Sequence, residues 1–170
     1  MLPLSEAGQV ERARGAVKAC ENEVKAIIAE RGINGRMIIE FDKLEIFGTP
    51  DETRVVYMKI KEDTDQFELL REVNHILIQS LIDHKVLQRR ELSHVNLNPK
   101  TKRYESDKLH LTLLNSSFAI KDLMKDNKRT FCSKDVMDNH GDIKFENGFA
   151  KTIEISTRFN YEESTGFYKS

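Results

Sequence analysis

The hydrophobic positions of the first third of the chain recur with helical spacing and then switch to the alternation of strands. Between Ser5, which suits a helix N-cap, and about Ala29, apolar side chains recur every three or four positions, and Gly32 follows. Segments 36–48 and 54–61 alternate instead, with the turn sequence TPDET between them. The sequence therefore predicts a helix, then one strand or a bulged pair of strands, then a turn and a further strand.

A second helix is predicted from Asp63 or Thr64 to about Lys85. Its apolar stripe is expected to consist of Phe67, Leu70, Leu77 and Leu81. Residues 87–107 show no clear periodicity, and an unstructured stretch of that length inside a compact domain is usually functional or an insertion.

The rest of the chain predicts further strands and one short helix near 133–138. Strands are expected around 108–117, at 142–146, at 150–159 and at 165–170. This order of elements predicts an α+β fold with antiparallel sheets and helices on their outer faces. The length of 170 residues suits a single domain, and we expect it to span 1–170.

The strand sequence KLHLTLLNSS carries the candidate chemistry. Alternation in a strand places His110 and Thr112 on one face and Leu109, Leu111 and Leu113 on the other, which we expect to face the core. An imidazole can move a proton near neutral pH, and a hydroxyl can donate to a phosphate oxygen. The tripeptide H-x-T is common, so an ordinary surface face is the alternative.

The charge is distributed unevenly, although the net charge is only −1. Lys85–Lys108 carries +4 and Lys121–Lys134 carries +3, which leaves −8 for the rest of the chain. Both basic stretches flank the His110 strand, which favours a basic rim around a phosphate-bearing ligand, with solvated loops as the alternative. The candidate phosphate- or nucleic-acid-binding residues are Lys102, Arg103, Lys108, Asn115 and Ser116.

Other features narrow the function classes. No apolar run approaches the length of a membrane span, and the N-terminus lacks the apolar stretch of a secretory signal. Two cysteines make no disulfide framework, and no metal-ligand spacing is present, so we expect no metal and no cofactor. The remaining histidines have simpler interpretations: a helix end for His84, a solvated position for His75, a turn for His140 and an irregular stretch for His94.

Three stretches together resemble the two-histidine phosphoesterase superfamily: KLHLTLLNSSF, GTPDETRVVYMKI and DIKFENGFAKTIEISTRF. Within it, the likeness is to the C-terminal domain of activating signal cointegrator complex subunit one. That domain is shared with the nuclear-localised A-kinase anchoring proteins. The resemblance runs from about residue 2 to the end.

The resemblance implies a two-lobed fold in which each lobe contributes one H-x-[T/S] strand to a groove. One histidine acts as general base and the other as general acid on a phosphodiester or cyclic phosphate. His110 and Thr112 are then the catalytic residues of the second motif. In the family the first motif precedes the segment similar to MLPLSEAG, so we expect the domain to be incomplete at its N-terminus. An unpaired sheet edge would then favour self-association.

Three functions follow as hypotheses. The first is a domain that binds nucleotide or RNA phosphates in a nuclear transcription-coactivator or DNA-repair complex, catalytically impaired because it has one H-x-T motif. The second is an active phosphodiesterase for RNA ends or cyclic phosphates, once the other motif is supplied. The third is a protein-interaction scaffold. The resemblance implies the other complex subunits as partners and the nucleus as location, with the cytoplasm as a second place.

Overall fold

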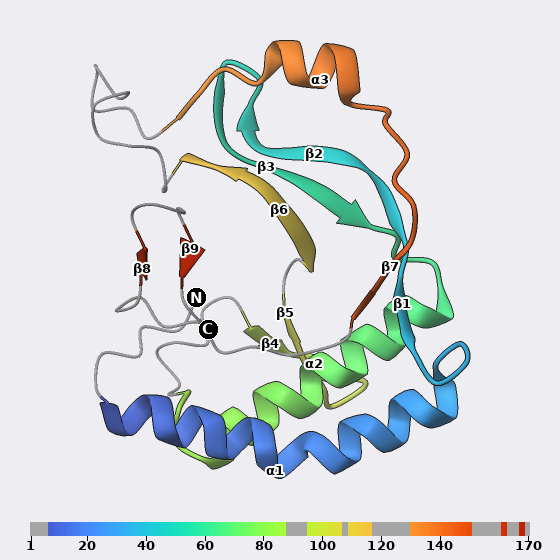
Figure 1. Cartoon of the computed structure of the whole chain (residues 1–170), viewed down its shortest axis with the longest axis vertical. Coiled ribbons are helices and arrows are strands. Elements are labelled where there is room, and N and C mark those ends of the chain that lie inside the picture. Colours follow the sequence, from blue (N-terminus) through green and yellow to red (C-terminus); the bar gives the residue numbers. More distant parts are fainter. Residues whose placement is uncertain are drawn as a thin grey trace. The chain divides into compact units, whose positions relative to one another are not determined.

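Helices and antiparallel strands make up the computed structural model, which describes residues 7–87, 95–106, 109–116, 130–150, 161–162 and 167–168 (Figure 1). This is the α+β fold that the element order predicts. The chain divides into two compact units, composed of Met1–Ile38, Glu68–Asp107 and Phe149–Ser170, and of Ile39–Phe67 and Lys108–Gly148. No helix in the described ranges is long and apolar enough to cross a membrane.

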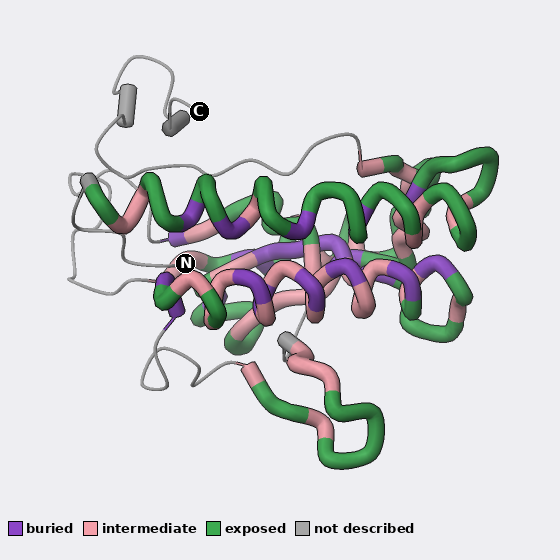
Figure 2. Tube along the Cα trace, turned by 90° about the horizontal axis from the view of Figure 1, so that it is seen from below, coloured by how far each residue is buried: buried purple, intermediate pink, exposed green. Residues whose placement is uncertain are grey.

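Two long helices, α1 (Ala7–Arg31) and α2 (Asp65–Asp83), lie side by side in the first unit (Figure 1). Buried positions recur along one side of α1, whereas its other side is exposed (Figure 2). The Ser80 hydroxyl donates to the Ala16 carbonyl oxygen at 2.7 Å, which joins the two helices by a buried hydrogen bond. The buried core of this unit consists of Cys20, Val24, Met37, Leu69, Val73 and Ile76.

The buried stripe of α2 differs from the predicted one. Its buried positions include Leu69, Val73, Ile76 and Ser80, whereas the four predicted apolar positions are only half-buried. Apolar residues stand next to each other at 69–70 and 76–78, so two phases of the 3.6-residue period fit the sequence equally well. The face of α2 that is buried is the one that contains the small Ser80, whose hydroxyl bonds to Ala16 of α1.

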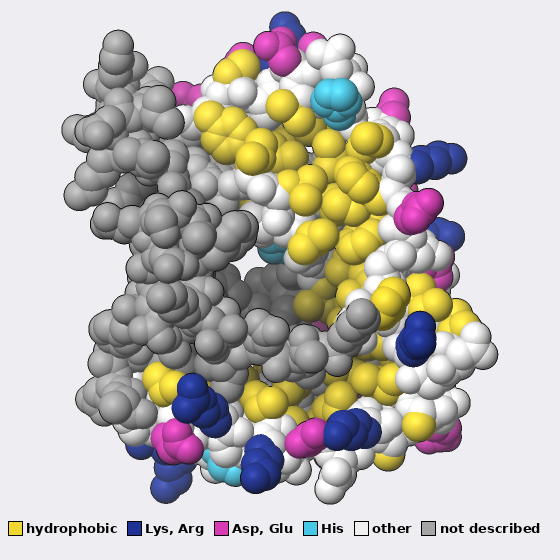
Figure 3. All heavy atoms as spheres, in the orientation of Figure 1, with side chains coloured by type: hydrophobic (Ala, Val, Ile, Leu, Met, Phe, Trp, Pro, Cys, Tyr) yellow, Lys and Arg dark blue, Asp and Glu magenta, His cyan; other side chains and the backbone are white. Residues whose placement is uncertain are grey.

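The second unit contains an antiparallel sheet with the order β2 (Phe41–Thr49), β3 (Glu52–Ile60) and β6 (His110–Asn115). Helix α3 (Lys134–His140) lies beside β2 and β3 (Figure 1), and hydrophobic side chains gather in the same region (Figure 3). The buried core residues of the sheet are Leu44, Val56 and Met58, against which Phe41, Ile46, Phe131, Val136, Met137 and Phe145 pack.

The turn between β2 and β3 requires a glycine. Gly48 has a φ of +113°, and a Cβ atom there would collide with the carbonyl oxygen of Glu52. Just beyond the turn, the fully buried hydroxyls of Thr53 and Ser133 are hydrogen-bonded at 2.6 Å. This contact joins the start of β3 to the residue before α3.

The remaining strands are short. They form the pairs β1 (Met37–Ile39) with β7 (Gly148–Ala150), β4 (Val95–Leu97) with β5 (Tyr104–Ser106), and β8 (Tyr161–Glu162) with β9 (Phe167–Tyr168). Of the two alternatives predicted for segment 36–48, one strand or a pair of strands, the pair is confirmed as β1 and β2. The expected strand at 142–146 is wrong, because the chain is irregular there, and 151–159 lies outside the described residues.

Strand β6 departs from expectation in what its leucines contact. Leu111 and Leu113 are 47% and 44% exposed, so the predicted burial of this apolar side is wrong. Within the described sheet β6 is the last strand in the order, which leaves these side chains with neighbours on one side only. The register with β3 also shifts by one residue, because Val56 pairs with Leu114 and Tyr57 pairs with Thr112. Leu113 is the extra residue of this β-bulge.

Candidate functional site

His110 and Thr112 share one face of the three-stranded sheet. In the antiparallel register, His110 lies opposite Lys59 and Thr112 lies opposite Tyr57. Directly opposite side chains of an antiparallel pair project to the same side. The pairing of Glu45 with Tyr57 extends this side across β2. We call it the site face, and its residues are Glu45, Phe47, Tyr57, Lys59, His110 and Thr112.

Two aromatic rings position the His110 imidazole. The centroid of the His110 ring lies 4.9 Å from that of Tyr57 and 5.3 Å from that of Phe47, both in edge-to-face geometry. Phe47 and Tyr57 also contact each other, with centroids 4.5 Å apart. Aromatic pairs favour such arrangements, so the three rings restrict the orientation of the imidazole.

A polar chain of three residues lies beside these rings. The Tyr57 hydroxyl donates to Oε2 of Glu45 at 2.8 Å, and Nζ of Lys59 lies 3.8 Å from Oε1 of the same carboxylate. Burial raises the pKa of the Tyr57 phenol to about 12, and the hydrogen bond and the negative charge of Glu45 add to the shift. At neutral pH the phenol is therefore protonated and acts as a donor.

The other predicted residues near the H-x-T strand occupy different environments. Asn115 pairs with Val55, which places it on the site face at the far end of β6. Ser116 is only 6% exposed, so its hydroxyl offers little surface to a ligand. Lys108 lies outside the described residues.

The two remaining predicted cations belong to the first unit, not to the unit that contains His110. Arg103 forms an ion pair with Glu72, with 3.1 Å between Nη2 and Oε2, and Glu72 also binds Arg31. Lys102 is exposed and has a φ of +56° in the turn between β4 and β5. The described residues thus place one predicted cation in an ion pair and the other on a loop.

The family model described as "AKAP7 2'5' RNA ligase-like domain" matches residues 1–170. The chain belongs to this family. A search of curated proteins finds no match. Membership supports a phosphoesterase-like domain of the two-histidine type.

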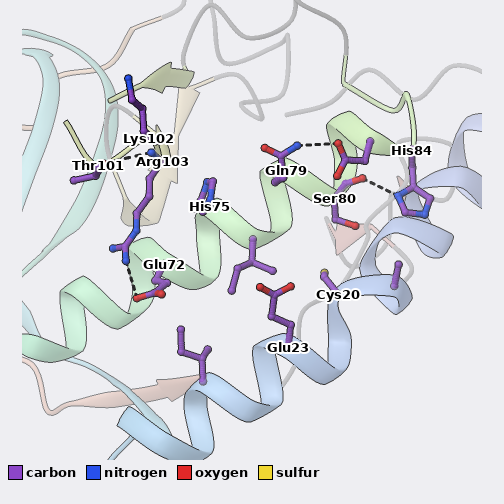
Figure 4. Close-up of a pocket in the computed structure, with 14 residues that line it drawn as sticks. Cys20, Glu23, Glu72, His75, Gln79, Ser80, His84, Thr101, Lys102 and Arg103 are labelled. Atoms are coloured by element: carbon purple, nitrogen blue, oxygen red, sulfur yellow. Dashed lines mark hydrogen bonds and ion pairs between the residues drawn. The ribbon is translucent and has the colours of Figure 1, made fainter. Parts of the chain in front are cut away.

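This AKAP7-type domain also has a pocket of about 520 Å³ in its first unit (Figure 4). Side chains from α1, α2 and the β4–β5 turn surround it, among them Cys20, Glu23, His75 and Lys102. Several polar groups there are already paired, since Gln79 donates to Asp83 and His84 contacts the Ser80 carbonyl oxygen. All of its lining residues belong to the first unit, and none of them is a residue of the site face.

The other described histidines of this family member have structural partners. The backbone N–H of Tyr104 donates to Nδ1 of His75 at 2.9 Å, so the prediction of a solvated His75 is wrong. His84 lies just after the end of α2, as predicted, and His140 is the last residue of α3. His94 lies outside the described residues. Within the described ranges, no group of three His, Cys, Asp or Glu side chains is placed to hold a metal ion.

Sequence reasoning missed the residues that surround His110. Phe47, Glu45 and Lys59 belong to strands more than 50 positions earlier in the chain. Alternation in RVVYMKIK already groups Tyr57 with Lys59, but only the register shows which of them lies opposite His110. That register is set by the bulge at Leu113 and could not be read from one strand alone.

Proposed function

We propose that this domain binds the phosphate groups of nucleotides or RNA on its site face. The observation that carries the proposal is the placement of the His110 imidazole and the Thr112 hydroxyl side by side, with the imidazole packed against Phe47 and Tyr57. A hydroxyl and an imidazolium are both donors to phosphate oxygens. Membership of the AKAP7 2'5' RNA ligase-like family supports the same chemistry.

The proposal includes impaired turnover. The sequence contains one H-x-[T/S] motif, whereas acid–base cleavage of a phosphodiester uses one group to take a proton and another to give one. The domain therefore acts as a binding module, in line with its likeness to the cointegrator domain and to the nuclear anchoring proteins. On this proposal it works in the nucleus with other subunits of a transcription-coactivator or DNA-repair complex.

The test compares adenosine 5′-monophosphate, adenosine and a short single-stranded RNA by isothermal titration calorimetry. We expect the monophosphate to bind more tightly than adenosine, and the RNA affinity to fall as salt rises because phosphate contacts release counterions. His110→Ala should weaken monophosphate binding because it removes an imidazole donor to the phosphate oxygens. Equal affinities for adenosine and its monophosphate would contradict the proposal. Replacing both Lys102 and Arg103 by alanine tests the predicted basic rim in the same assay.

An active phosphodiesterase is the second candidate, because an imidazole is a common general acid or base. Release of product from a 2′,3′-cyclic nucleotide measures it. We expect little or no turnover from the chain alone, and turnover that survives His110→Ala would place the chemistry elsewhere.

An interaction scaffold is the third candidate, favoured by the exposed Leu111, Leu113 and Leu114 on β6. Exposed strands with apolar side chains recruit other strands. Analytical sedimentation of the wild type and of a Leu111→Lys variant measures self-association. We expect the wild type to self-associate more strongly than the variant.

A further inference from the structure

Lys59 is the cross-strand neighbour of His110. The two residues are partners in the β3–β6 register, on the same side of the sheet. In such a pair the Cβ atoms lie about 5 Å apart, which is within the reach of a single phosphate group. The side chain of Lys59 therefore brings a positive charge next to the imidazole, from a strand that the H-x-T motif does not include.

The only ion pair of Lys59 among the described residues is long. Its Nζ lies 3.8 Å from Oε1 of Glu45, too far for a hydrogen bond, and both side chains are 33% exposed. The Tyr57 hydroxyl occupies the other carboxylate oxygen of Glu45 at 2.8 Å. Glu45 is thus held in place by Tyr57, while Lys59 is held loosely by Glu45. Partly exposed ion pairs of this kind are weak, so an arriving phosphate can compete with Glu45 for the ammonium group.

We infer that Lys59 is a phosphate-binding residue of the site face, with Glu45 as its counter-ion in the absence of ligand. This inference rests on the proposed function and names the cation that binds the phosphate. Nζ donates to one phosphate oxygen while the Thr112 hydroxyl donates to another. Charge-assisted hydrogen bonds of this type are among the strongest that a protein offers to phosphate. No covalent step is involved.

Lys59 and Arg103, a cation predicted from the charge runs, belong to different units of the chain. Arg103 shares the Glu72 carboxylate with Arg31 in the first unit, whereas Lys59 lies in the same sheet as His110 and Thr112. A lysine suits the position because its flexible stem lets the ammonium move from Glu45 to a ligand without a change in the strand.

The experiment titrates four proteins with adenosine 5′-monophosphate and with adenosine: the wild type, Lys59→Met, Lys59→Arg and Arg54→Met. Arg54 is the matched control, because it lies on the same strand, is exposed and alternates to the other side of the sheet. We expect Lys59→Met to lose about 10- to 100-fold in monophosphate affinity, the usual effect of removing a hydrogen bond to a charged group. Adenosine affinity should not change. Lys59→Arg should retain most of the affinity, and Arg54→Met all of it.

A second variant keeps the test decisive if Lys59→Met folds poorly. Glu45→Gln preserves an acceptor for the Tyr57 hydroxyl and removes the counter-ion of Lys59, so monophosphate affinity should rise about two- to fivefold. If monophosphate binding depends on His110 but is unchanged in both Lys59→Met and Glu45→Gln, the role of Lys59 is wrong and the proposed function stands. If the wild type does not distinguish the monophosphate from adenosine, both are wrong.

Discussion

The Tyr57 hydroxyl donates a 2.8 Å hydrogen bond to Oε2 of Glu45 and so links β3 to β2 beside the His110 ring. Tyr57 is itself only 4% exposed, although it lies on the side of the sheet that carries the polar site residues. One side chain therefore fixes the carboxylate and packs against the imidazole.

This relationship predicts a stability change at alkaline pH. The pKa of Tyr57 is raised to about 12, so folding favours the protonated phenol. The protonated phenol contributes to the free energy of unfolding. This contribution is fully present below the ordinary tyrosine pKa of about 10 and is lost as the pH rises toward 12. The free energy of unfolding should decrease over that window, measured by urea denaturation. Tyr57→Phe keeps the ring and should show a smaller decrease there. Identical alkaline profiles would disprove the assignment.

Thr112→Val should separate binding from folding. The side chain is exposed and lies in a strand, where valine keeps the β-branched shape. We expect the affinity for adenosine 5′-monophosphate to fall about tenfold, as for one lost hydrogen bond to a charged group. The free energy of unfolding should change by less than about 0.5 kcal/mol. Thr112→Ser is the control, since it retains the hydroxyl and should retain the affinity.

Thr53→Val tests the buried contact between the β2–β3 turn and α3. The change removes the hydroxyl that bonds to Ser133 at 2.6 Å and donates to the Thr49 carbonyl oxygen at 2.8 Å, and the side chains of Thr53 and Ser133 are 0% exposed. We expect a loss of about 1–3 kcal/mol in the free energy of unfolding, because a buried polar group loses its partner. Thr53→Ser should cost less. A loss no larger for valine than for serine would mean that the two hydrogen bonds of this hydroxyl contribute nothing.

The two cysteines should react with iodoacetamide at different rates. Cys20 is buried in the core of the first unit, and burial raises the pKa of its thiol, whereas Cys132 is exposed. A less ionised and less accessible thiol reacts more slowly. Peptide mapping after partial alkylation of the native protein should find the label on Cys132 first. If Cys20 is alkylated as fast in the native protein as in urea, the burial of Cys20 is contradicted.

Local sequence patterns predicted the elements that have long, regular periods. The helices at 7–31 and 65–83 and the strand at 110–115 follow from apolar spacing and alternation. The hairpin of β4 and β5 escaped prediction because three-residue strands are too short to establish a period. The buried face of α2 was not predicted correctly, because adjacent apolar residues in the sequence are compatible with two different apolar stripes.

The candidate site was predicted only in part, for a physical reason. Alternation within one strand is enough to place His110 and Thr112 together. Their neighbours Phe47 and Lys59 depend on strand pairing, which is a property of two distant segments. Charge runs along the chain also pointed to Lys102 and Arg103, which belong to the other unit, and their part in binding stays a prediction.

The bulge at Leu113 decides which side chain follows Thr112 on the site face. In a regular strand that position would belong to Leu114, and the face would end in an apolar group. With one extra residue, Leu114 pairs with the core residue Val56 and Asn115 lies opposite Val55 instead. Because Leu113 is bulged out and not paired, a carboxamide and not a leucine stands at the end of the row that begins with His110. Deleting Leu113 would remove the bulge and leave Leu114 opposite Val56 and Asn115 opposite Val55, so the polar row would keep all of its members in a strand of regular pairing.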